Sequence, residues 1–136
     1  MQPNTPQQKR VAMSLLTAAR DMEMAENAVR NTPHLYEGIG FHCQQAVEKY
    51  LKAVLVSFAM AAPFTHNLVV LMGTLQQANQ LSFDAQELAD AAVLNEFAVD
   101  LRYETDDAPD YTSADLLAMA TRFQRKLQPL AQAFLI

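Results

Sequence analysis

Side chains that could take part in chemistry are concentrated in residues 41–55, FHCQQAVEKYLKAVL. His42, two glutamines, Glu48 and Lys52 lie there among apolar residues. A histidine near its neutral pKa can move protons, and a charged side chain can bind an anion. The stretch is therefore either a functional site or one polar face of a helix.

A helical arrangement separates these side chains into two groups. At 100° per residue, Cys43, Val47 and Tyr50 fall on one apolar arc, whereas Gln45 and Glu48 fall on the opposite side with Phe41 and Lys52. Glu48 and Lys52 form an i,i+4 pair worth about 0.2–0.5 kcal/mol if exposed. The stripe suits a solvated face, but a buried dimer face would need partners for each polar group, and Phe41 favours an interface.

Composition and periodicity indicate an all-α fold in a single domain spanning residues 1–136. The chain has three Gly and no Trp, and its Ala, Leu, Gln and Met favour helix over strand. We expect an antiparallel up-and-down four-helix bundle with one additional short helix. The expected helices span residues 6–30, 36–60, 66–78, 84–103 and 113–135, with Thr5, Thr65, Asp84 and Thr112 or Ser113 as start signals.

The sequence lacks the residue patterns of common metal sites and phosphate-binding loops. Cys43 is the single cysteine, and it points about 100° away from His42 on a helix, so these neighbours cannot hold a metal on one face. No Glu has a His three residues later, as di-metal bundles require, and no Gly-rich phosphate loop is present. His34, His42 and His66 could meet only through the fold, so we expect neither a metal nor a cofactor.

Charge is distributed unevenly along the chain. The formal charge is −5, but residues 84–115 contain ten acidic residues against Arg102 alone. This distribution argues against coating nucleic acid through bulk positive charge, so any RNA contact must be local. We also expect a cytoplasmic protein, since the chain contains neither a signal core nor an apolar run of about 20 residues.

Three sequence pieces together resemble the HEPN family. They are FHCQQAVEKYLKA from residue 41, His66-x-Leu68 at the start of the third expected helix, and Arg102-Tyr103 near the end of the fourth. The first piece is the most specific, and the three occur in the family's order over nearly the whole chain. The resemblance implies an antiparallel bundle that commonly forms a homodimer, often encoded beside a minimal nucleotidyltransferase in toxin–antitoxin or defence systems.

The resemblance also implies where catalysis would occur, and this sequence departs from it there. Active HEPN ribonucleases are metal-independent and use an Arg followed, after four to six residues, by a His. Arg102 occupies the arginine position, but no histidine lies between Tyr103 and Tyr111. Arg102 therefore suits binding better than cleavage, and the acids near it favour a structural ion pair over either role.

We expect a nucleotide- or RNA-associated HEPN module that lacks the full ribonuclease motif and acts with a nucleotidyltransferase partner. One alternative is a ribonuclease toxin in which Tyr103 or His66 replaces the missing histidine. Another is a helical adaptor without a ligand. The candidate binding residues are Arg102, Tyr103, His66, Lys52, Gln45 and Glu48, with Arg102 as the candidate catalytic residue.

Overall fold

The computed structural model describes residues 5–78, 81–98 and 110–136. All regular secondary structure in these ranges is α-helical, which confirms the all-α expectation. The helices are α1 (Pro6–Asn31), α2 (Tyr36–Ser57), α3 (Leu68–Gln77), α4 (Ala85–Asn95) and α5 (Ser113–Ala133). None of the helices among the described residues is long and apolar enough to cross a membrane.

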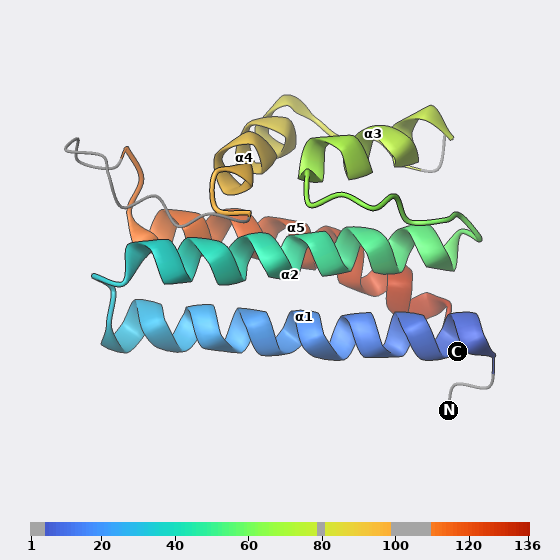
Figure 1. Ribbon diagram of the computed structural model, residues 1–136, viewed down its shortest axis with the longest axis horizontal. Coiled ribbons are helices and arrows are strands. Elements are labelled where there is room, and N and C mark those ends of the chain that lie inside the picture. The colour runs from blue at the N-terminus through green and yellow to red at the C-terminus, as the bar shows by residue number, and fades with distance from the viewer. Residues whose placement is uncertain (1–4, 79–80, 99–109) are drawn as a thin grey trace.

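Helix α2 is the central element of the bundle. It contacts each of the other four described helices. In Figure 1, α1 and α5 run along α2, whereas the shorter α3 and α4 lie on the side away from α1. Some side chains of α2 are therefore buried among the other helices, and the rest lie on the side of α2 that α1 and α3 border.

Local start signals fix the beginnings of four helices. Capping boxes join Thr5 with Gln8, Asp84 with Glu87, and Thr112 with Asp115. Thr5 and Asp84 are the caps that the sequence predicts, and of the two candidates Thr112 and Ser113 the cap is Thr112. The expected cap of α3 is wrong. The N-cap is Asn67, whose side chain accepts bonds from two backbone N–H groups, whereas the Thr65 hydroxyl accepts one from Asn67 N.

The end of α2 is three residues earlier than expected and forms a known C-terminal motif. Met60 N donates to Leu55 O at 2.9 Å, and Ala59 N donates to Val56 O at 2.9 Å. These two bonds define a Schellman motif, which places one residue in the left-handed region. That residue is Ala59, with φ of 59°, where glycine is usual.

The fourth helix is shorter than its apolar pattern indicates. The pattern predicts a helix as far as residue 103, but α4 ends at Asn95, and residues 99–103 lie outside the described part of the chain. Phe97 turns into the core and packs edge-on against Tyr36, with 5.4 Å between ring centroids. Thus α1, α2 and α5 are long helices, and the expectation of a fourth long helix here was wrong.

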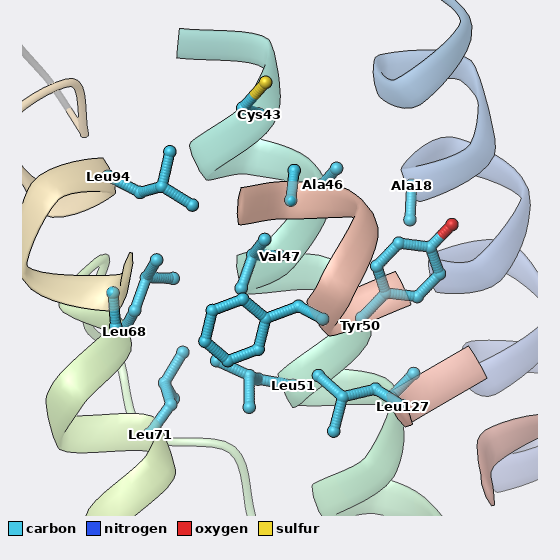
Figure 2. Close-up of a cluster of buried hydrophobic side chains, with 14 of the residues drawn as sticks. Ala18, Cys43, Ala46, Val47, Tyr50, Leu51, Leu68, Leu71, Leu94 and Leu127 are labelled. Carbon is cyan, nitrogen blue, oxygen red and sulfur yellow. The ribbon is translucent and has the colours of Figure 1, made fainter. Parts of the chain in front are cut away.

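The apolar arc of α2 forms the middle of the core (Figure 2). Cys43, Val47, Tyr50 and Leu51 are buried, as their helical positions predict. The Tyr50 hydroxyl is also satisfied, because it accepts a 3.1 Å bond from Gln124 Nε2 on α5. Helix α2 therefore buries one side and leaves its polar side near the edges of α1 and α3.

Candidate functional site

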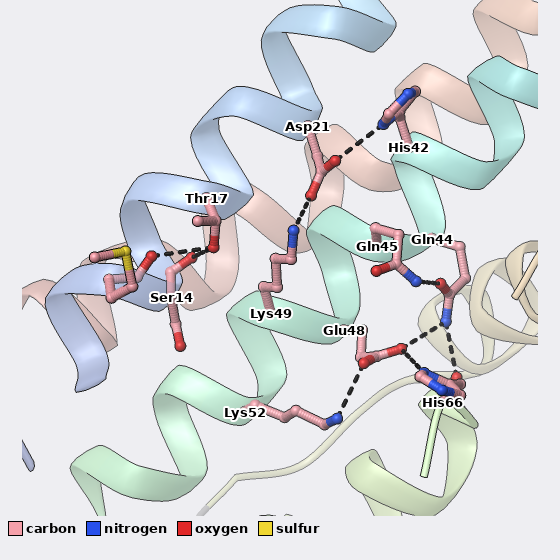
Figure 3. A network of polar contacts seen from close by, with 11 residues as sticks. Ser14, Thr17, Asp21, His42, Gln44, Gln45, Glu48, Lys49, Lys52 and His66 are labelled. Atoms are coloured by element: carbon pink, nitrogen blue, oxygen red, sulfur yellow. Dashed lines mark hydrogen bonds and ion pairs between the residues drawn. The ribbon is translucent and has the colours of Figure 1, made fainter.

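Glu48 is the centre of a polar network on α2. The residue is 6% exposed, and Figure 3 shows its carboxylate between Gln44, Lys52 and His66. Oε1 accepts bonds from Gln44 Nε2 at 3.2 Å and His66 Nδ1 at 3.0 Å, while Oε2 accepts one from Lys52 Nζ at 3.0 Å. The interpretation of Glu48 as part of a solvated stripe was wrong, because its side chain is buried. Its hydrogen-bond partners come from its own chain, so it needs none from a second copy.

The same network attaches the segment before α3 to α2. Gln44 Nε2 also donates to the backbone carbonyl of His66 at 2.7 Å, and Gln45 Nε2 donates to Gln44 Oε1 at 2.8 Å. Four of the expected site residues, Gln45, Glu48, Lys52 and His66, therefore lie in one connected cluster. His66 is half-exposed, with 58% of its side chain accessible.

A second buried carboxylate joins α1 to α2. Asp21 is 7% exposed and accepts a 2.9 Å bond from His42 Nδ1 through Oδ1, while its Oδ2 accepts one from Lys49 Nζ. Asp21 was missed by sequence reasoning. Its position three residues after Ala18 and beside Met22, on the buried arc of the first helix, is the signal that could have found it.

The two networks share one pattern, in which a buried carboxylate holds one imidazole Nδ1 and one ammonium group. An ionised carboxylate only accepts hydrogen bonds, so Nδ1 carries the proton in both histidines. Nε2 is then the atom left for a ligand or a proton. Within each network the carboxylate and the lysine cancel in charge, so a protonated imidazole would make the surface positive.

The thiol of Cys43 lies close to this region but takes no part in it. Burial, and secondarily the negative charge of Asp21, raise the pKa of Cys43 to about 12. A thiol with this pKa is almost entirely protonated at neutral pH and is a poor nucleophile.

The histidines do not assemble into one cluster. His42 and His66 belong to different networks, and His34 lies in the connection between α1 and α2. Among the described residues, no group of three or more His, Cys, Asp or Glu side chains is placed to hold a metal ion.

The acidic residues of α4 find their partners on α5. Asp90, 1% exposed, accepts bonds from Arg122 Nε at 2.8 Å and Arg122 Nη2 at 3.0 Å, and Glu87 accepts one from Lys126 Nζ at 2.9 Å. The hydrogen bond from Arg122 to Asp90 raises the pKa of the guanidinium. Sequence reasoning considered only Arg102 as a neutralising cation and missed this pairing, which requires knowing that α4 packs on α5.

A cavity of about 360 Å³ opens beside this ion pair, between α4 and the start of α5. Its polar lining comes from Gln86, Asp90, Asp110, Tyr111, Asp115 and Arg122. Arg102 and Tyr103, the remaining expected site residues, lie outside the described part of the chain.

The comparisons with known proteins identify the family. The model of the HEPN domain matches residues 11–127, so this chain belongs to the HEPN family. No curated protein matches the sequence significantly.

Two solved structures share the fold. The crystal structure of ST0689, an archaeal HEPN homologue, is 23% identical with a TM-score of 0.68, over 89% of this chain and 97% of that chain. TT1696 from Thermus thermophilus is 21% identical with a TM-score of 0.62, over 93% of this chain and 95% of that chain. At these identities the likeness establishes the helical architecture.

Proposed function

We propose that this HEPN protein is a nucleotide- or RNA-associated module that binds its ligand without cleaving it. Membership of the HEPN family over residues 11–127 is the observation that carries the proposal. The absence of a histidine between Tyr103 and Tyr111 argues for binding over catalysis, because an Arg alone offers no group that titrates near neutral pH.

The polar side of α2 supports this role. Lys52 and Lys49 are each held by a buried carboxylate, and about a third or less of each side chain is exposed. An ammonium has three N–H donors, so one bond to a carboxylate leaves further donors for a phosphate. Gln45 and His66 would add neutral and titratable donors beside Lys52, and Arg102 with Tyr103 would complete the ligand contacts.

Titration with labelled RNA tests this role of Arg102. If Arg102 binds phosphate, Arg102→Ala should weaken binding by about 1.5–3 kcal/mol, as for loss of a charge-assisted hydrogen bond, with the melting temperature almost unchanged. Arg125→Ala, at an exposed position on α5, is the charge-matched control and should leave affinity unchanged. A lower melting temperature without a change in RNA affinity would instead make Arg102 a structural residue and favour a helical adaptor.

A ribonuclease with an altered site is the second candidate, and the environment of His66 favours it. Buried Glu48 fixes the imidazole through Nδ1, and the half-exposed side chain leaves Nε2 for proton transfer to or from an RNA 2′-hydroxyl. Cleavage of labelled RNA in the presence of a chelator, abolished by His66→Ala and retained in Arg125→Ala, would establish this activity. Binding without cleavage would exclude it.

We also propose that the protein forms a homodimer and acts with a minimal nucleotidyltransferase in a toxin–antitoxin or defence system. The family resemblance supports both partners. Light scattering at micromolar concentration should give twice the mass of 15.1 kDa, and a monomer mass would refute the homodimer. Co-purification with a nucleotidyltransferase encoded by a neighbouring gene would test the second partner.

A further inference from the structure

Arg122 presents a fixed but incompletely used donor group beside the cavity between α4 and α5. Its side-on edge, Nε and Nη2, is occupied by Asp90, which is buried and also accepts a 2.8 Å bond from Gln86 Nε2. Among the described residues, no other group bonds to Arg122, whose side chain is 46% exposed. Of the groups that the structure describes, none occupies the end-on edge formed by Nη1 and Nη2, which can bind two adjacent acceptors of a ligand.

The charge of the cavity excludes the usual ligand of such an arginine. Among the described lining residues, three carboxylates, Asp90, Asp110 and Asp115, stand against one guanidinium, that of Arg122, which gives a formal charge of −2. A phosphate or carboxylate ligand would gain two bonds from Arg122 but would be repelled by this surplus. The acceptors should therefore belong to a neutral group.

The remaining lining residues define the rest of that group. Tyr111, 40% exposed, offers an aromatic face, and carboxylates accept hydrogen bonds from amines. A neutral planar ligand with two adjacent acceptors on one edge and N–H donors on another would match the Arg122 donors, the Tyr111 ring and the carboxylates. Guanine has this pattern, since O6 and N7 pair with the arginine fork and N1–H and the 2-amino group donate.

We propose that the cavity between α4 and α5 is a guanine subsite. In it Arg122 binds O6 and N7, Tyr111 stacks on the base, and Asp110 or Asp115 accepts from N1–H and the 2-amino group. The volume of about 360 Å³ lies within the roughly 300–1,000 Å³ of small-molecule sites. The proposal rests on the proposed nucleotide or RNA association, to which it adds base selectivity. The phosphate of the nucleotide would remain outside the acidic cavity.

Calorimetric titration with nucleosides tests the subsite without the phosphate. Guanosine should bind at least tenfold more tightly than adenosine, cytidine or uridine. 7-Deazaguanosine, which lacks the N7 acceptor, and inosine, which lacks the 2-amino group, should each bind about tenfold more weakly than guanosine. Equal binding of the four nucleosides, or no loss with either analogue, would overturn the proposal.

Protein variants locate the site. Arg122→Ala would leave buried Asp90 without its cation and could unfold the protein, so the informative changes are Tyr111→Ala and Asp110→Asn. Each should weaken guanosine binding at least fivefold. Phe64→Ala, at a fully exposed aromatic residue elsewhere, and Glu23→Gln, at an exposed acid of α1, are the matched controls and should leave binding unchanged.

RNA titrations separate this proposal from the proposed function. If RNA binds with equal affinity whether or not it contains guanine, the guanine subsite fails and the RNA association stands. If no nucleoside, nucleotide or RNA binds, both fail. Tighter binding of guanine-containing RNA that Tyr111→Ala removes, while RNA without guanine binds as before, would support both.

Discussion

Gly40→Ala should destabilise the protein because Phe97 occupies the space that a side chain would need. A Cβ at residue 40 would lie 2.3 Å from Cδ1 and 2.6 Å from Cγ and Cε1 of the Phe97 ring. The ring is 8% exposed and packs against Tyr36, so it cannot move away without losing buried contacts. This contact also explains why α2 carries a glycine at a buried position.

The expected magnitude combines two opposing effects. Overpacking a core by one methyl group costs about 1–3 kcal/mol, whereas replacing a helical glycine with alanine gains up to about 1 kcal/mol. Because contacts of 2.3 and 2.6 Å are far inside van der Waals distance, the overpacking cost should fall in the upper part of its range, and the net loss should be about 1–2 kcal/mol. For a domain of this size, this loss lowers the melting temperature by about 3–8 °C.

Two other glycines provide matched controls for the assay, which is thermal or denaturant unfolding followed by circular dichroism. A Cβ at Gly38 or Gly73 would meet no atom within 4 Å, so alanine there should leave stability unchanged or raise it by up to about 1 kcal/mol. Equal or higher stability of Gly40→Ala relative to Gly73→Ala would refute the packing of Phe97 against residue 40. If Gly40→Ala is instead less stable than Gly73→Ala, adding Phe97→Leu to Gly40→Ala should recover part of the lost stability.

Three further predictions concern single side chains. Cys43 should react slowly with a thiol reagent at pH 8 until denaturant is added. Because the pKa of about 12 in the folded protein exceeds the ordinary value of 9.0, stability should fall as pH rises from about 9 to 12. Cys43→Ala should reduce this pH dependence. Glu48→Gln should lower the unfolding free energy by about 1–2 kcal/mol, a value reduced because Lys52 and His66 are partly solvated. The control Glu26→Gln, at an exposed position, should leave the unfolding free energy unchanged. An unchanged value for Glu48→Gln would contradict the network. Ala59→Gly should raise stability by up to about 1 kcal/mol in denaturant unfolding, since glycine relieves the left-handed φ; lower stability would show that the Schellman motif does not control the end of α2.

The sequence by itself determined the elements that depend on neighbours along the chain. Capping boxes at Thr5, Asp84 and Thr112 bond residues three positions apart, so local sequence suffices to place these helix starts. The burial of Cys43 and Tyr50 follows from their 3.6-residue spacing along one helix. The HEPN motif pieces are likewise visible in the sequence, and the family match confirms the membership they indicate.

Only the tertiary structure decided which polar groups meet. Glu48 lies on the polar side of its helix, yet it is buried because His66, 18 residues later, and Gln44 close over it. Asp21 and Lys49 are 28 residues apart, and their pairing depends on how α1 packs along α2. Helical periodicity gives the direction of a side chain from its own axis, whereas burial depends on what another element places there, and that is set by the packing of the whole chain.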